Sequence, residues 1–136
     1  MKSIRIGLIG TGFMGKTHLW SVKNLPFFYK TADMGYTAEV VSVCGSGMEK
    51  ARAFATEFGI PKAVATPEEI IADPAVDVVD ICVPTPDHAG LIIAALKAGK
   101  HVVCANNQGT RARAAKIREQ RRPLGVNERD ILIGKG

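Results

Sequence analysis

The chain has 136 residues, of which 46% are hydrophobic and 23% are charged, and its formal net charge is +5. This length suits one domain, and the hydrophobic share is typical of a globular chain and speaks against intrinsic disorder. Apolar runs stay below the ~18 residues that a membrane-spanning helix needs, and the N-terminus has no signal-peptide pattern. We therefore expect a soluble, cytoplasmic protein without a membrane partner.

The positive charge is concentrated at one end of the chain. Residues 1–104 contain ten Lys or Arg and ten Asp or Glu, so this part is neutral. Residues 105–136 contain eight basic and three acidic residues and therefore carry the whole excess. The break predicts a body over residues 1–104 and a basic, divergent tail over residues 105–136.

The body alternates short apolar runs with helical patterns. Strands are predicted at residues 4–9, 39–44, 62–65, 76–83 and 101–104, helices at residues 13–23, 48–58 and 85–98, and a further helix start at residues 66–69. Thr66 and Glu69 have the spacing of a capping box, and Gly59 and Gly99 follow the last residues of two helices. Strands joined by helical connections predict an α/β fold with a doubly wound, parallel, Rossmann-type sheet.

The turn after the first predicted strand has the pattern G-x-G-x-x-G, in the order Gly10-Thr11-Gly12-Phe13-Met14-Gly15. Gly10 would allow the tight turn, Gly12 would let a pyrophosphate approach the backbone, and Gly15 would let helix and strand pack closely. A plain tight turn is the alternative. Because a strand precedes the pattern and a helix follows it, we predict a dinucleotide-binding loop.

The second strand is followed by Cys44-Gly45-Ser46-Gly47, where NAD-binding proteins usually have the Asp or Glu that accepts hydrogen bonds from the adenine ribose. This turn contains no carboxylate. Ser46 can donate to a 2′-phosphate, and Lys50 follows on the next helix, unless it belongs only to a solvated helix face. The cofactor is predicted to be NAD or NADP, with NADP favoured.

The fourth strand is followed by Pro84-Thr85-Pro86-Asp87-His88. Ligands of open α/β sheets bind outside the carboxyl ends of strands, so Pro84, Thr85, Pro86 and His88 are predicted along the nicotinamide side. For His88, local packing is an equal alternative. His18 is expected to be structural.

The three cysteines, Cys44, Cys82 and Cys104, lie inside apolar runs. We expect reduced core cysteines rather than a disulfide or a metal site.

Three stretches in this order resemble the glucose–fructose oxidoreductase, inositol dehydrogenase and rhizopine-catabolism (Gfo/Idh/MocA) family. They are the run from Ile6 to Gly15 with Thr17-His18, the run from Val79 to Ala89, and the run from Ala94 to Cys104. The resemblance implies the N-terminal NAD(P)-binding domain of an oxidoreductase. Such enzymes transfer hydride between nicotinamide and a sugar, polyol or related small substrate.

The chain departs from this family after Cys104. The family pattern continues with Glu-Lys-Pro, whereas this chain reads Ala105-Asn106-Asn107-Gln108. Asparagine has no titratable amine and cannot replace the lysine in proton transfer. The family also has a C-terminal substrate domain, which residues 105–136 are too few to form. We therefore assign no catalytic residue, and the alternative is a non-catalytic nucleotide-binding module or a truncated remnant.

The tail has a helical pattern over residues 110–122 and a short strand pattern over residues 131–133. A frameshift, a truncation and natural divergence are all compatible with it. Its arginines form a cationic helix without interleaved aromatic residues, so a solvated or partly disordered tail is favoured over a nucleic-acid partner. Exposed sheet edges and uncovered helix faces allow self-association.

Overall fold

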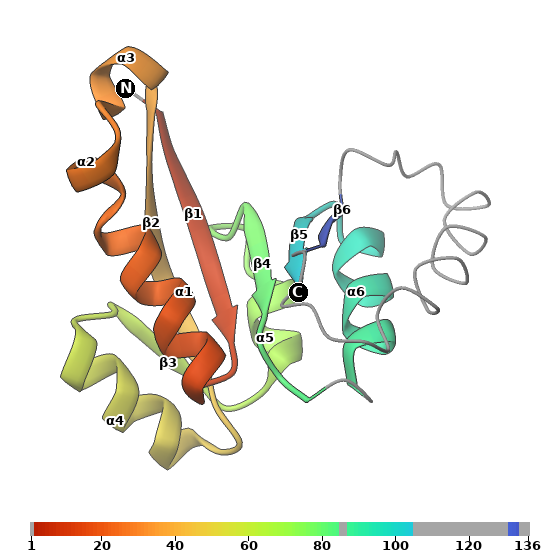
Figure 1. Cartoon of the computed structure of the whole chain (residues 1–136). Helices are drawn as coiled ribbons and strands as arrows, with labels where there is room; N and C mark the ends of the chain where they lie inside the picture. The colour runs from red at the N-terminus through yellow and green to blue at the C-terminus, as the bar shows by residue number, and fades with distance from the viewer. Residues whose placement is uncertain (1, 85–86, 105–130, 134–136) are drawn as a thin grey trace.

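A computed structural model describes residues 2–84, 87–104 and 131–133 of the chain (Figure 1). The strands in this part are β1 (Lys2–Ile9), β2 (Tyr36–Cys44), β3 (Lys62–Val64), β4 (Val78–Ile81), β5 (His101–Cys104) and β6 (Ile131–Ile133). The helices are α1 (Phe13–Lys23), α2 (Leu25–Phe28), α3 (Thr31–Met34), α4 (Met48–Phe58), α5 (Pro67–Ile71) and α6 (His88–Lys97). Within these residues, no helix combines the length and the hydrophobicity that crossing a membrane requires.

The six strands form one parallel sheet in the order β3-β2-β1-β4-β5-β6. The chain builds outward from β1 to β3, then returns to the other side of β1 and builds outward from β4 to β6. The order therefore reverses between β1 and β4, and the carboxyl ends of these neighbouring strands flank the switch point. The predicted doubly wound, Rossmann-type fold is confirmed.

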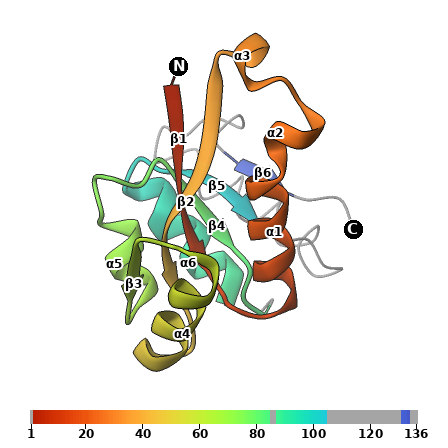
Figure 2. The same cartoon turned by 90° about the vertical axis from the view of Figure 1, so that its left-hand side faces the viewer.

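Two hydrophobic cores lie on opposite faces of the sheet. Leu8 and Ile9 are adjacent on β1 and almost fully buried, but they belong to different cores. On the Leu8 side the core includes Leu19 of α1 with Phe54 and Ala55 of α4. On the Ile9 side it includes Ile70 and Ile71 of α5 with Ile92, Ala95 and Leu96 of α6. Figure 2 shows α1 and α5 on opposite sides of the strands. Each large aliphatic side chain buried in this way contributes about 1.5–3 kcal/mol.

The helix boundaries follow local chemistry. The Glu69 carboxylate accepts the backbone N–H of Thr66 at 2.9 Å and closes the predicted capping box at the start of α5. Gly59 and Gly99 have φ angles of +69° and +79°, a region that favours glycine, and they follow α4 and α6 closely. These stop signals explain why the predicted ends of both helices agree with the structure to within a residue.

Some boundaries differ from the sequence-based expectation. The connection before β2 contains two short helices, α2 and α3, and β2 begins at Tyr36 rather than at residue 39. Strand β4 is shorter than the apolar run over residues 76–83. The predicted strand over residues 131–133 is present and pairs with β5. The predicted helix over residues 110–122 lies outside the described residues.

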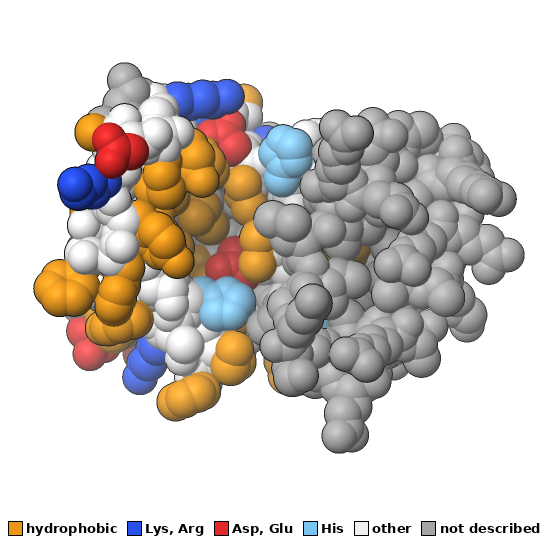
Figure 3. Space-filling view, turned by 45° about the horizontal axis from the view of Figure 1, so that its top comes forward, with side chains coloured by type: hydrophobic (Ala, Val, Ile, Leu, Met, Phe, Trp, Pro, Cys, Tyr) orange, Lys and Arg blue, Asp and Glu red, His pale blue; other side chains and the backbone are white. Residues whose placement is uncertain are grey.

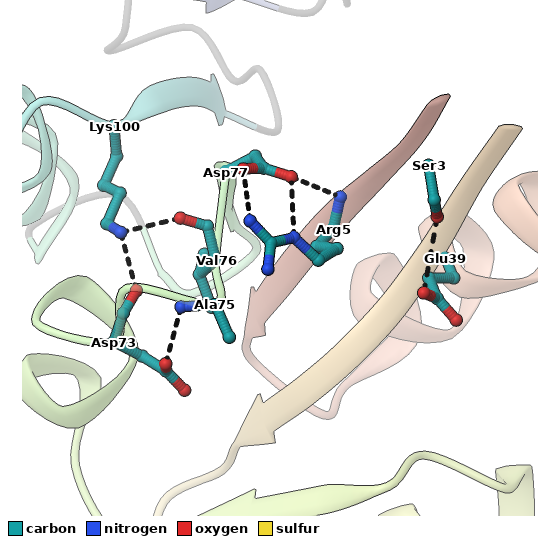
Figure 4. Close-up of polar contacts among 8 residues, drawn as sticks. All are labelled: Ser3, Arg5, Glu39, Asp73, Ala75, Val76, Asp77 and Lys100. Carbon is teal, nitrogen blue, oxygen red and sulfur yellow. Dashed lines mark hydrogen bonds and ion pairs between the residues drawn. The ribbon is translucent and has the colours of Figure 1, made fainter. Parts of the chain in front are cut away.

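Polar contacts hold the amino ends of the strands together (Figure 4). Asp77 accepts hydrogen bonds from the Arg5 backbone at 2.9 Å and from its guanidinium at 3.0 and 3.1 Å. Lys100 donates to the carbonyls of Asp73 and Val76 at 2.6 Å each. The hydrogen bonds of Arg5 hold the pKa of Asp77 at about 2, well below the ordinary value of a carboxyl group. These contacts link β1, β4 and the segment before β5 at the edge opposite the glycine loop.

Candidate functional site

The glycine loop between β1 and α1 is tightly packed at two of its glycines. Gly10 has a φ of +117°, and a Cβ there would lie 2.5 Å from the Cys82 carbonyl oxygen. A Cβ at Gly15 would lie 2.2 Å from the Gly10 carbonyl oxygen. The Gly10 N–H donates to the Cys44 carbonyl at 2.9 Å. Side chains are therefore excluded at positions 10 and 15 by the backbone of the loop itself and of the strand end beside it.

The surroundings of Gly12 are open instead. A Cβ at this position would meet no atom within 4 Å. Gly12 is the N-cap of α1, no side chain caps the helix there, and the first turn contains no acidic residue. The side chains of Phe13 and Met14 are 82% and 40% exposed. An uncapped helix N-terminus with an open approach is suited to a phosphate group, because its amides and the helix dipole favour negative charge.

The turn after β2 lies against the glycine loop. A Cβ at Gly45 would be 3.2 Å from the Thr11 side chain and 3.3 Å from the Cβ of Lys50. Ser46 is exposed, as are Lys50 and, one residue before it, Glu49 in the first turn of α4. The structure thus brings Thr11, Gly45 and Lys50 together beside the exposed Ser46.

Beyond β4, Pro84 is exposed, whereas His88 is only 3% exposed. The Nε2 atom of His88 is bonded to the Val83 carbonyl, so its Nδ1 atom is placed to accept from the Cys104 thiol at 3.1 Å. These contacts favour the local-packing interpretation of His88. Thr85 and Pro86 lie outside the described residues.

The cysteines are thiols, as expected, with Cys44 and Cys104 buried and Cys82 half-buried. Burial raises the pKa of both Cys44 and Cys104 to about 11, and it also raises the pKa of Cys82.

A cluster of three polar side chains, His18, Asp80 and Cys82, lies next to the glycine loop and was not predicted from the sequence. The Nδ1–H of His18, on α1, donates to the two carboxylate oxygens of Asp80, on β4, at 2.8 and 2.9 Å. The Cys82 thiol donates to the same carboxylate at 3.3 Å. The hydrogen bond to Asp80 raises the pKa of His18 above its ordinary value. The sequence offered one signal, a carboxylate inside the apolar run of β4, where a buried charge requires a partner.

One ligand atom from each of His18, Asp80 and Cys82 could hold a metal ion, since these atoms lie within 4.8 Å of one another. The same atoms are already joined by hydrogen bonds, in which the Asp80 carboxylate accepts from His18 and from Cys82.

Among the hollows in the described part of the chain, one lies at the amino ends of the strands and another along α1. One, of about 660 Å³, is lined by Ile4, Ile6, Val78 and Val103 together with charged residues at the amino ends of the strands. Hydrophobic side chains gather on this side of the molecule (Figure 3). The other, of about 440 Å³, runs along α1 past Phe13 and Trp20.

Two curated dehydrogenases illustrate the relatives of this sequence. Levoglucosan dehydrogenase of Pseudarthrobacter phenanthrenivorans is 38% identical over 104 residues, which are 76% of this chain and 26% of that protein. Myo-inositol 2-dehydrogenase of Thermotoga maritima is 34% identical over 101 residues, which are 74% of this chain and 27% of that protein. The chain thus spans about a quarter of the length of these relatives.

Solved structures agree with this relationship. A levoglucosan dehydrogenase in complex with NADH and levoglucosan has a TM-score of 0.72 and 36% identity, covering 76% of this chain and 27% of that one. An NAD-binding oxidoreductase from Klebsiella pneumoniae has a TM-score of 0.81 and 30% identity, covering 97% of this chain and 34% of that one. Residues 4–106 match the family model of an oxidoreductase family with an NAD-binding Rossmann fold. The chain therefore belongs to the Gfo/Idh/MocA family of oxidoreductases and corresponds to its N-terminal, NAD-binding part.

Proposed function

We propose that this chain binds NAD or NADP at the glycine loop, with the pyrophosphate against the first amides of α1. The open space above Gly12 is the observation that carries this proposal, because it lies at the uncapped end of a helix beside the switch point of the sheet. Thr11, Phe13 and Met14 would then contact the cofactor alongside Gly10, Gly12 and Gly15. Backbone amides would supply the phosphate site, which explains how a neutral body can bind a dinucleotide.

At the adenine end we propose that Ser46 and Lys50 face the ribose, and that the site accepts NADP at least as well as NAD. Support comes from the turn over residues 44–47, which has no carboxylate to repel a 2′-phosphate, and from the exposure of both side chains. Lys50 would add positive charge beside that phosphate.

On the nicotinamide side we propose that Pro84, Thr85, Pro86 and His88 line the approach of the ring. His88 would act indirectly, because its buried ring fixes the strand end through Val83 and does not itself face the nicotinamide.

The reaction that we propose for the complete enzyme is hydride transfer between the nicotinamide and a small sugar, polyol or related substrate. Support comes from the relatives, whose names include levoglucosan dehydrogenase and myo-inositol 2-dehydrogenase. Bound NAD or NADP would supply the hydride chemistry. The residues of this chain would hold and orient the cofactor, and a substrate domain would have to complete the site.

A second candidate function is nucleotide binding without catalysis. Ala105-Asn106-Asn107-Gln108 stands where the resembled pattern has Glu-Lys-Pro, so the amine expected beside the nicotinamide is missing. A chain of this kind would bind cofactor without turning over any substrate.

Calorimetric titration with NAD, NADH, NADP and NADPH tests the binding proposal. Gly12→Ala fills the open space above the loop, and we expect it to weaken dinucleotide binding about tenfold or more. Gly90→Ala is the matched control, because its Cβ also enters open space but on α6 rather than in the glycine loop. Failure of the unaltered chain to bind any of the four nucleotides would refute the proposal.

Substrate turnover separates the two functions. A screen of sugars and polyols, monitored by nicotinamide absorbance, should give turnover only if the chain is an enzyme. Binding without turnover would favour the non-catalytic module.

A further inference from the structure

The cluster formed by His18, Asp80 and Cys82 lies directly below the glycine loop. His18 is three residues after Gly15 on α1, and Cys82 supplies the carbonyl that excludes a side chain at Gly10. Asp80 is 5% exposed and its carboxylate is bonded to both His18 and Cys82. One buried carboxylate therefore joins the helix and the strand end between which the loop is held.

The loop depends on contacts from both sides. On the strand side, the Cys82 N–H donates to the Ile9 carbonyl at 2.7 Å, and the Gly10 N–H donates to the Cys44 carbonyl. On the helix side, Gly15 lies against the Gly10 carbonyl. Among the described residues, the polar contacts between α1 and β4 run through His18. The first turns of α1 are thus held over the strand ends by the apolar packing of Leu19 and by one charge-assisted pair to β4.

Such a pair is suited to positioning. A hydrogen bond to a buried carboxylate is shorter and stronger than one between neutral groups, and a buried carboxylate that loses its partner is strongly unfavourable. The pair therefore allows little displacement of α1 relative to β4. The phosphate-binding amides are carried by the same helix, one turn before His18.

We propose that Asp80, acting through His18, is a positioning residue for the pyrophosphate of the dinucleotide. It fixes the angle at which the start of α1 meets the loop, and so determines how well the helix amides align with the phosphates. This inference rests on the proposed nucleotide binding at the loop. It predicts that substitutions of Asp80 and His18 weaken the binding of ligands with a diphosphate and not of ligands without one. A purely structural role would weaken both.

The test compares ADP with adenosine, which lacks the diphosphate, by calorimetry on the full 136-residue chain. In Asp80→Asn and His18→Ala we expect ADP binding to weaken about fivefold relative to adenosine, because the helix terminus no longer faces the phosphates. In His18→Asn the side-chain amide can donate from nearly the position of Nδ1, and we expect most of the ADP affinity to return. The conservative variant also covers the case in which Asp80→Asn does not fold.

Asp77→Asn is the matched control. Asp77 is three residues from Asp80, but it is bonded to Arg5 at the opposite end of the strands. Its substitution should lower the melting temperature and leave the ratio of ADP to adenosine affinity unchanged.

Two results would overturn the positioning role of Asp80 and leave the proposed nucleotide binding intact. One is an equal change of the ratio of ADP to adenosine affinity in Asp77→Asn and Asp80→Asn, and the other is an unchanged ratio in both His18 variants. Absence of ADP and NAD binding by the unaltered chain would overturn the proposed function and this inference with it.

Discussion

Gly15→Ala measures how tightly the glycine loop is packed. A Cβ at position 15 would lie 2.2 Å from the Gly10 carbonyl oxygen, whereas ordinary contacts begin at 3.4 Å. In Gly15→Ala, α1 must therefore move about 1 Å away from the Gly10 backbone, because a backbone carbonyl cannot rotate away as a flexible side chain can. Overpacking of this kind costs about 1–3 kcal/mol. The higher helix propensity of alanine offsets up to about 1 kcal/mol of that cost. With the full offset, we expect a net destabilisation of up to about 2 kcal/mol.

Gly90→Ala separates the effect of the contact with Gly10 from the effect of the higher helix propensity of alanine. Gly15 and Gly90 are each the third residue of their helices, and a Cβ at Gly90 would meet no atom within 4 Å. The two variants share the propensity gain, so their difference in stability reports the clash. Thermal unfolding followed by circular dichroism should show a lower melting temperature for Gly15→Ala, by about 3–5 °C per kcal/mol, and a raised one for Gly90→Ala. Equal melting temperatures of the two variants would refute the reasoning.

Three further predictions concern stability measured by urea unfolding. The pKa of Asp77 is held at about 2 by Arg5, so its contribution is present above the ordinary carboxyl pKa of 3.8 and is lost as the pH falls through about 2. Asp77→Asn should lower the free energy of unfolding by about 1 kcal/mol at neutral pH and should remove this loss of stability in acid. An unchanged loss of stability in acid would contradict the prediction. The pKa of His18 is raised by the hydrogen bond to Asp80, so its contribution is present below 6.5 and is lost as the pH rises through the folded-state pKa. His18→Asn should remove this pH dependence and should lower the free energy of unfolding by about 1 kcal/mol at pH values below the pKa of His18. If stability changes with pH in the variant as it does in the unaltered chain, the pair of His18 and Asp80 is not its cause. The Ser42 hydroxyl is buried without a hydrogen-bond partner among the described residues, so Ser42→Ala should stabilise the chain by about 0.5–1 kcal/mol. A destabilised Ser42→Ala would show that the hydroxyl is satisfied.

The parts of the fold that the sequence predicted well are those with local signals. Helix α4 has the predicted bounds because Gly59 ends it, and α5 begins where Thr66 and Glu69 form a capping box. Strand β4 is recognisable because both of its faces are covered, which requires a nearly continuous apolar run. The short helices α2 and α3 were missed because each has four residues, which are too few to show a helical period.

The site could be predicted only as far as its backbone. Gly15 is required by a contact with Gly10 inside the same loop, and such a local contact leaves a pattern in the sequence. The pair of His18 and Asp80 joins residues 62 positions apart, and each residue alone fits several local roles. His88 was ambiguous for the same reason, because its burial depends on Val83 and on Cys104 in the neighbouring strand.

The charge break after residue 104 does not coincide with the end of the sheet. Strand β6 lies within the basic tail and pairs with β5 through Val102 and Ile131, Val103 and Leu132, and Cys104 and Ile133. Parallel neighbours need a crossover of about a dozen residues or more, and the 26 residues between these strands are enough. The Klebsiella pneumoniae structure covers 97% of the chain, whereas the family match ends at residue 106. The net charge of +5 therefore lies mainly on a connection between two strands of one sheet.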